Sequence, residues 1–279
     1  MTRANGWQLS DDAARSYEEY SRRLLVPWVL PLLDAVQLAP GEQVLDVACG
    51  TGFVARQAIE RVRPSGAVTG VDVNGSMLSI AHAKNGDGEG LRWVQCNVTE
   101  LPFPSGSFDV AVCQQGLQFF PRPTNALEEV RRVLVPGGRL GVSVWGALQD
   151  NIYFAALEEA VARFVGSEAA EGLRNPHAHA DPQGVLAILQ DGGFVEIEAK
   201  ACSIEMQLPP PENFVLDHLS AMPVASAINA LSPHTRAQLF DTVRERLEPY
   251  RGDAGLLVPS LVNIGTARAP QESPPEGWA

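Results

Sequence analysis

The chain has 279 residues, of which 45% are hydrophobic and 19% charged, a composition typical of a soluble globular protein. Its 33 Asp and Glu residues outnumber 21 Lys and Arg residues, so the formal net charge is -12, and such a surface disfavours nucleic acids and membrane surfaces as partners. No apolar run approaches the roughly 20 residues that cross a bilayer, and the N-terminus lacks a signal-peptide core, which predicts a cytoplasmic protein.

The first 39 residues are predicted to form a helical lid. Ser10 is a candidate helix cap, and the apolar residues after it recur at helical spacing until Pro27 and Pro31 interrupt them. We expect this segment to pack across a sheet or across the mouth of a site.

Strands and helices alternate regularly between residues 40 and 146. Short apolar runs alternate with segments of helical periodicity, and "PGG" at 136–138 is expected to close the last helix. This rhythm predicts a parallel sheet covered on both faces. The expected strands are 42–48, 66–73, 91–98, 107–115 and 139–146, and the expected helices are 52–62, 75–84 and 123–134.

The regular alternation of strands and helices ends at about residue 146. Helices are expected over 151–166 and over 181–194, where an Asp cap is followed by a proline, and a strand is expected over 194–208. A mainly helical stretch, 208–254, precedes a last strand, 255–269. Pro259 within that strand predicts an edge or bulged position.

A glycine-rich turn follows the first expected strand. Gly50 and Gly52 allow close approach of a ligand to the backbone, and with Asp72 about 20 residues on they formally fit a dinucleotide fingerprint. Asp46 is expected to face this turn or to stand just behind it. It argues against a pyrophosphate, because like charges about 4 Å apart repel by several kcal/mol at an effective dielectric near 20. No Lys follows the glycines, which excludes a P-loop. The turn therefore favours a nucleoside-like ligand of cationic character.

These motifs resemble those of a known family. "VLDVACGTG", "GVDVNGSML", "VQCNVTELPFPSGSFDVAVCQQGLQFF" and "NALEEVRRVLVPGGRLGVSVWG" are similar, in order and spacing, to the motifs of class I S-adenosylmethionine-dependent methyltransferases, with the ubiquinone/menaquinone-biosynthesis type as the nearest branch. The resemblance covers roughly residues 40–146. It implies an α/β Rossmann-like sheet, mostly parallel with an antiparallel last strand, and S-adenosyl-L-methionine as cofactor.

The residue patterns and the resemblance together predict the following division of the chain. Residues 1–39 form the lid, 40–207 and 255–269 the cofactor-binding core, 208–254 a helical insertion that caps the acceptor side, and 270–279 a disordered tail. The oligomeric state stays open, with a homodimer as one option.

The resemblance also implies which residues bind the cofactor. Asp46 and the backbone after it surround the methionine moiety, Asp72 accepts hydrogen bonds from the ribose hydroxyls, and Asn97 stands where the family usually has an Asp that accepts from the adenine amino group. The full expected set is Tyr20, Asp46, Ala48, Gly50, Gly52, Asp72, Val73, Met77, Asn97, Val98, Gln114 and Gln115. For Asp72, Met77 and the two glutamines, a helix cap, core packing and plain strand-end polarity remain alternatives.

Methyl transfer from a sulfonium requires alignment rather than a protein nucleophile, and a base only where the acceptor must lose a proton. Tyr17, Phe119, Trp145 and His218 are expected to line the pocket of a small organic acceptor, with Phe119 and Trp145 as core residues the alternative. No catalytic residue is assigned, and His218 is the first candidate base. "HAH" at 177–179 is weak evidence for a metal, and no metal is expected.

Three other functions compete with this one. An NAD(P)-dependent oxidoreductase would bind NADH and not S-adenosylmethionine. A nucleic-acid methyltransferase is disfavoured by the charge and by the lack of an N-P-P-Y-type or Pro-Cys motif. A binding module that holds the cofactor without turnover would show no release of S-adenosylhomocysteine.

Overall fold

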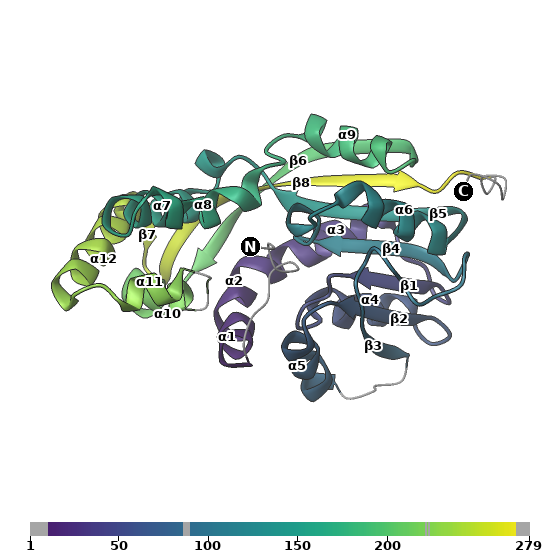
Figure 1. Cartoon of the computed structure of the whole chain (residues 1–279), viewed down its shortest axis with the longest axis horizontal. Helices are drawn as coiled ribbons and strands as arrows, with labels where there is room; N and C mark the ends of the chain where they lie inside the picture. Colours follow the sequence, from purple (N-terminus) through teal and green to yellow (C-terminus); the bar gives the residue numbers. More distant parts are fainter. Residues whose placement is uncertain (1–10, 86–89, 221, 223, 272–279) are drawn as a thin grey trace.

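The computed structural model describes residues 11–85, 90–220, 222 and 224–271. Within these ranges, eight strands form one sheet in the order β3-β2-β1-β4-β5-β8-β6, with β7 paired to β8 (Figure 1). β1 to β5 are parallel, whereas β8 is antiparallel to both β5 and β6. The strands are β1 (Gln43–Val47), β2 (Ala67–Asp72), β3 (Leu91–Gln95), β4 (Phe108–Gln114), β5 (Leu134–Trp145), β6 (Val195–Leu208), β7 (Arg251–Gly252) and β8 (Gly255–Arg268).

The sheet is covered on both faces, as its apolar pattern predicts. Side chains alternate along a strand, so Val44 and Val110 lie in one buried cluster and Leu45 and Ala111 in the other. The first cluster includes α3 (Val29–Val36) and α4 (Phe53–Val62), and the second includes α6 (Pro123–Val133) and α9 (Pro182–Asp191). The mostly parallel sheet with an antiparallel last strand is therefore confirmed.

The expectation that "PGG" forms the turn after a helix is wrong. α6 ends at Val133, and β5 begins at once with Leu134, so the three residues lie inside the strand. The register between β4 and β5 shifts there, between Phe108 and Val110. Gly137 adopts φ 74°, and its N–H donates to the carbonyl of Ala269. The segment is an irregular extension of the strand.

Within the sheet β8 lies between β5 and β6, yet Pro259 takes an edge position, one of the two alternatives that the sequence predicted. The last β5 partner of β8 is Val262, paired with Trp145, and at Pro259 the strand pairs with Glu205 of β6. The proline therefore sits where β5 no longer runs alongside, a local edge that tolerates a missing N–H. The Asp181 cap of α9 is also present, because its carboxylate accepts the N–H of Gly184 at 2.8 Å.

The N-terminal segment is helical but divided. α1 (Asp11–Ser16) continues into a π-helical turn, Tyr17–Ser21, then α2 (Arg22–Leu25), a 3₁₀ turn containing Pro27, and α3. The Ser10 cap lies outside the described residues, as does all but Pro270 and Gln271 of the expected disordered tail.

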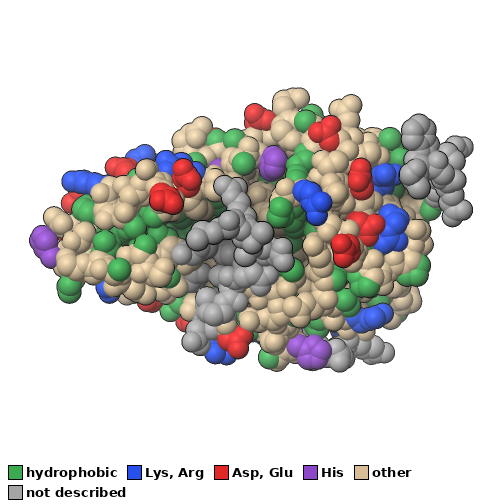
Figure 2. Space-filling view, viewed as in Figure 1, with side chains coloured by type: hydrophobic (Ala, Val, Ile, Leu, Met, Phe, Trp, Pro, Cys, Tyr) green, Lys and Arg blue, Asp and Glu red, His purple; other side chains and the backbone are tan. Residues whose placement is uncertain are grey.

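A helical layer lies beyond the carboxyl end of β5 (Figure 1). It contains α7 (Ile152–Phe164), α8 (Ser167–Arg174) and the three helices between β6 and β8, which are α10 (Val215–Ser220), α11 (Ala225–Asn229) and α12 (Pro233–Leu247). Phe214, Leu239 and Val243 share one buried cluster with the sheet, so this layer is continuous with the core. On the face shown in Figure 2, basic and acidic side chains are interspersed rather than gathered into one basic patch.

Candidate active site

The loop after β1 turns through left-handed residues. Ala48, Gly50 and Gly52 have φ of 54°, 54° and 85°, a region that costs a non-glycine residue about 1–2 kcal/mol. Gln115, at the end of β4, also has a positive φ of 55°. Strained non-glycine residues thus stand at the carboxyl ends of two neighbouring strands, where such strain often accompanies function.

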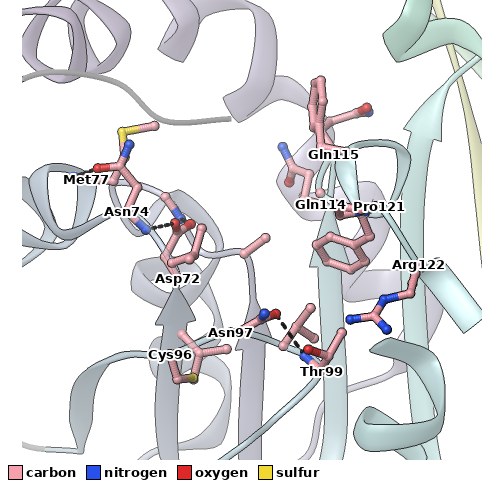
Figure 3. Close-up of a pocket in the computed structure, with 18 of the residues that line it drawn as sticks. Asp72, Asn74, Met77, Cys96, Asn97, Thr99, Gln114, Gln115, Pro121 and Arg122 are labelled. Atoms are coloured by element: carbon pink, nitrogen blue, oxygen red, sulfur yellow. Dashed lines mark hydrogen bonds between the residues drawn. The ribbon is translucent and has the colours of Figure 1, made fainter. Parts of the chain in front are cut away.

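Asp72, the last residue of β2, holds this loop. One carboxylate oxygen accepts the N–H of Gly50 at 2.9 Å, and the other accepts the N–H of Asn74 at 2.8 Å (Figure 3). Burial raises the pKa of Asp72, whereas the N–H groups that it accepts lower it. The Asn74 side chain in turn accepts the N–H of Ser76 at 3.0 Å, so the starts of α4 and α5 (Gly75–Asn85) are linked through one carboxylate.

A cavity of about 280 Å³ lies above these strand ends. Figure 3 shows Asp72, Asn74 and Met77 on one side of it and Gln114, Gln115 and Pro121 on the other. Nine of the residues predicted to bind the cofactor line it: Ala48, Gly50, Asp72, Val73, Met77, Asn97, Val98, Gln114 and Gln115. The structure therefore brings together most of the set that the motifs predicted.

Asp46 lies behind the cradle rather than facing it, which is one of the two positions expected for it, so it is corrected only as a residue that lines the cofactor site. Its side chain is 1% exposed, is not among the residues lining the cavity, and accepts the N–H of Ala55 in α4 at 2.9 Å. Burial raises its pKa to about 8, with the Ala55 hydrogen bond acting in the opposite direction. Burial thus favours the neutral carboxyl, and the side chain does not line the cavity, so the argument from its charge against a pyrophosphate is weakened.

Replacing Asp46 by asparagine should flatten the pH dependence of stability. The pKa of Asp46 is about 8 in the folded protein and ordinarily 3.8. The contribution of Asp46 to the free energy of unfolding is therefore complete below pH 3.8 and is lost as the pH rises through the folded-state pKa. Asparagine keeps an oxygen for the Ala55 N–H and carries no charge. The free energy of unfolding should fall between about pH 5 and pH 8 in the wild type, and this fall should be smaller in the variant by at least about 1.4 kcal/mol. Denaturant titrations measure this, and parallel pH profiles would contradict it.

Gly52 and Tyr20 also lie outside the cavity that they were expected to line. Gly52 begins α4, and a Cβ built on it would lie 2.5 Å from the Trp93 ring, so glycine is needed here for packing. Tyr20 packs against Phe214, with ring centroids 6.4 Å apart. The π-helical turn directs Tyr17 toward the site and Tyr20 toward the insertion.

A second cavity of about 60 Å³ adjoins the first. The four residues expected around the acceptor, Tyr17, Phe119, Trp145 and His218, all line it. Tyr17, Phe119 and Gln115 line both cavities. The second cavity therefore begins where the first ends, at the carboxyl end of β4.

Comparison with known proteins identifies the family. A model described as a methyltransferase domain matches residues 45–142. Nocamycin O-methyltransferase of Saccharothrix syringae is 31% identical over 220 residues, which is 74% of this chain and 78% of that protein. The chain belongs to the class I S-adenosylmethionine-dependent methyltransferases. S-adenosyl-L-methionine is its cofactor, and its relatives are of the small-molecule type.

Other methyltransferases extend the comparison. The ubiquinone/menaquinone biosynthesis C-methyltransferase UbiE of Ectopseudomonas mendocina is 30% identical over 61% of this chain and 72% of its own length. Phosphoethanolamine N-methyltransferase 2 of Haemonchus contortus, in complex with S-adenosyl-L-methionine, has a TM-score of 0.58 at 19% identity and covers 94% of this chain and 58% of that one. The cyclase SpnF has a TM-score of 0.53 at 22% identity and covers 88% and 81%. These two structures show the fold alone.

The first cavity of this methyltransferase also contains residues that the motifs did not select. Asn74 and Thr99 follow the ends of β2 and β3, so their position at the carboxyl edge of the sheet could have indicated them. Arg122, just before α6, carries no such signal. The unselected lining residues are Val71, Asn74, Cys96, Thr99, Gly116, Phe120, Pro121 and Arg122.

The N-terminal segment of this methyltransferase is fastened to the core beside the site. Glu18, a buried acid, lies 3.0 Å from Lys84 and 3.7 Å from Arg56, and the amide of Gln114 donates to the carbonyl of Leu25 at 2.8 Å. Burial raises the pKa of Tyr17, with Asp72 and Glu18 adding to the effect, so its hydroxyl stays protonated. The segment thus forms a wall of both cavities.

The two histidines of "HAH" have different surroundings. His177 is buried and lines the second cavity, whereas His179 is half-buried and its backbone carbonyl accepts from Asn263 at 3.0 Å. Across the described ranges, no group of three or more His, Cys, Asp or Glu side chains could hold a metal ion. In the same ranges, no helix is long and apolar enough to span a bilayer.

Proposed function

We propose that this methyltransferase transfers the methyl group of S-adenosylmethionine to a small, flat organic acceptor held in the second cavity. The observation that carries the proposal is the shared wall: Tyr17, Gln115 and Phe119 line both cavities. A ligand in each cavity would meet at these side chains, which is the arrangement that direct transfer requires.

Two buried polar atoms beside the first cavity lack a partner in the part of the chain that the structure describes, and the cofactor could pair with both. Oε1 of Gln114 and Nε2 of Gln115 are buried and have no hydrogen-bond partner within the described residues, and buried polar groups are normally paired. The ammonium of a methionine moiety would donate to the first, and its carboxylate would accept from the second. In this proposal Asp72 accepts from the ribose hydroxyls, and Met77 and Val98 flank the adenine.

In this proposal Asn97 accepts a hydrogen bond from the adenine amino group. Its side-chain oxygen accepts the N–H of Thr99 at 3.1 Å (Figure 3). A carbonyl oxygen has two lone pairs and can still accept from an amino group. One of the two lone pairs of the Asn97 side-chain oxygen is thus already engaged by the backbone of Thr99.

Methyl transfer requires that the acceptor atom in the second cavity be aligned with the methyl carbon and the sulfur of the cofactor. Bound S-adenosylmethionine supplies an activated methyl group on a positively charged sulfur. The acceptor's lone pair forms the new bond to the methyl carbon while the carbon–sulfur bond breaks and its electron pair stays on sulfur. Tyr17, Phe119 and Trp145 hold the acceptor and exclude water, and positioning of this kind can supply about 7–11 kcal/mol of barrier lowering.

The assay that tests this proposal measures S-adenosylhomocysteine. Purified protein is incubated with S-adenosylmethionine and a panel of small phenols, enols, amines and activated carbon acids, and cofactor affinity is measured separately by calorimetry. We expect release that depends on an acceptor. Tight cofactor binding with no release from any panel member would favour a binding module without turnover.

A further inference from the structure

The second cavity contains a histidine whose tautomer is fixed by the backbone. Nδ1 of His177 lies 2.7 Å from the carbonyl oxygen of Gly146, directly after β5. A carbonyl oxygen only accepts, so Nδ1 carries a proton. Burial lowers the pKa of His177, with the carbonyl acting in the opposite direction, and the ring is neutral. Its Nε2 therefore carries a lone pair.

The other histidine of this cavity has the opposite tautomer. Nδ1 of His218 lies 3.0 Å from the hydroxyl of Tyr153, which is 1% exposed. Within the described residues, this is the one hydrogen bond of that hydroxyl. If Nδ1 donated, the tyrosine proton would be buried without an acceptor, which costs about 1–3 kcal/mol. Tyr153 therefore donates, and the proton of His218 lies on Nε2.

Both rings share one wall of the cavity. The centroid of the Phe154 ring lies 5.8 Å from that of His177 and 6.3 Å from that of His218. His218 is also stacked on Phe214, with centroids 5.3 Å apart and planes at 7°, which fixes its plane. Both residues line the cavity, and within the described residues no hydrogen bond reaches Nε2 of either ring.

The cavity is thus lined by one histidine whose Nε2 can accept a hydrogen bond and one whose Nε2 can donate, together with aromatic and aliphatic side chains. We propose that the acceptor is an acidic hydroxyl flanked by a carbonyl, as in an enol or a phenol with an adjacent carbonyl group, and that His177 removes its proton while His218 donates to the carbonyl. This inference rests on the proposed function.

The assignment corrects the expectation that His218 is the first candidate base. Burial lowers the pKa of His218 to about 3, and Tyr153 occupies its basic nitrogen, so it acts as a hydrogen-bond donor. In the proposed step, the hydroxyl proton moves to Nε2 of His177, the oxygen lone pair forms the bond to the methyl carbon, and the sulfur keeps the pair from the broken bond. The proton leaves His177 after product release. Because burial weakens His177 as a base, an aliphatic alcohol is a poor acceptor.

Imidazole ¹⁵N spectroscopy tests the tautomers without turnover. In the protein saturated with S-adenosylhomocysteine, we expect His177 to be protonated on Nδ1 and His218 on Nε2, with signals assigned from H177N and H218N. Titration with 2-hydroxyacetophenone, a phenol with an adjacent carbonyl group, should shift both Nε2 signals, and benzyl alcohol at the same concentration should not. Nε2 protonation of His177, no shift with 2-hydroxyacetophenone, or equal shifts with both probes would overturn the proposal.

Kinetics separates this inference from the proposed function. His177→Asn keeps an N–H for the Gly146 carbonyl and removes the basic nitrogen, and His179→Asn is the matched control. With an enolic or phenolic acceptor, H177N should reduce kcat/KM about 100-fold or more, retain cofactor affinity, and recover activity as rising pH ionises the acceptor. Turnover by H177N at the wild-type rate would refute the role of His177 and leave methyl transfer intact. Correct tautomers without turnover of any acceptor would refute the proposed function instead.

Discussion

Asp72→Ala should weaken binding of S-adenosylmethionine at least tenfold, or about 1.4 kcal/mol. The carboxylate lines the first cavity and also accepts the N–H groups of Gly50 and Asn74. Alanine removes the proposed ribose acceptor and leaves two backbone donors without their partner, so ligand contact and loop shape are lost together. Isothermal titration of the cofactor measures the effect.

Asp109→Ala is the matched control for this change. Asp109 also accepts a backbone N–H, that of Gln43 at 2.8 Å, but it does not line the cavity. Its replacement should leave cofactor affinity unchanged. An equal loss in both variants, or an unchanged dissociation constant for Asp72→Ala, would remove the assignment of Asp72 to the ribose.

Gly52→Ala should destabilise the fold by at least about 2 kcal/mol, the sum of left-handed strain and overpacking. A Cβ on Gly52 would lie 2.5 Å from the Trp93 ring, at a φ of 85°. For a chain of this size the melting temperature should fall by about 4 °C or more. Differential scanning calorimetry measures the change.

Gly106→Ala separates strain from steric conflict. Gly106 also has a positive φ, 69°, but a Cβ there would meet no atom within 4 Å. This variant should lose about 1–2 kcal/mol, the strain alone. If the two variants melted at the same temperature, contact with Trp93 would not be the reason for glycine at position 52.

The sequence predicted the sheet and much of the first cavity because strand ends can be read from apolar runs. Carboxyl ends of parallel strands meet at one edge, and the family resemblance assigned Asp72, Asn97 and Gln114 to the cofactor site at that edge, where they line the cavity. Asp46 takes the second of its two expected positions, behind the cradle, because it lies inside β1 rather than at its end. Side chains alternate along a strand, and Asp46 shares its face with Val44, toward α4.

Other features had no readable signal in the sequence. The π-helical turn Tyr17–Ser21 interrupts the helical periodicity, and helical spacing alone could not show that Tyr17 and Tyr20 would diverge. His177 lies in a segment that the sequence marks as a loop, yet its ring is buried on the Gly146 carbonyl. The donor and acceptor roles of the two histidines depend on contacts between distant segments, which no local pattern encodes.

The wall formed by Tyr17, Gln115 and Phe119 belongs to both cavities. Occupancy of either cavity therefore alters the surface presented to the other ligand, and the two binding equilibria are linked. Linkage is reciprocal: if the bound methyl donor changes the affinity of the protein for the acceptor by some factor, the bound acceptor changes the affinity for the donor by the same factor. The spent cofactor should then be retained or released according to whether methylated product still fills the neighbouring space.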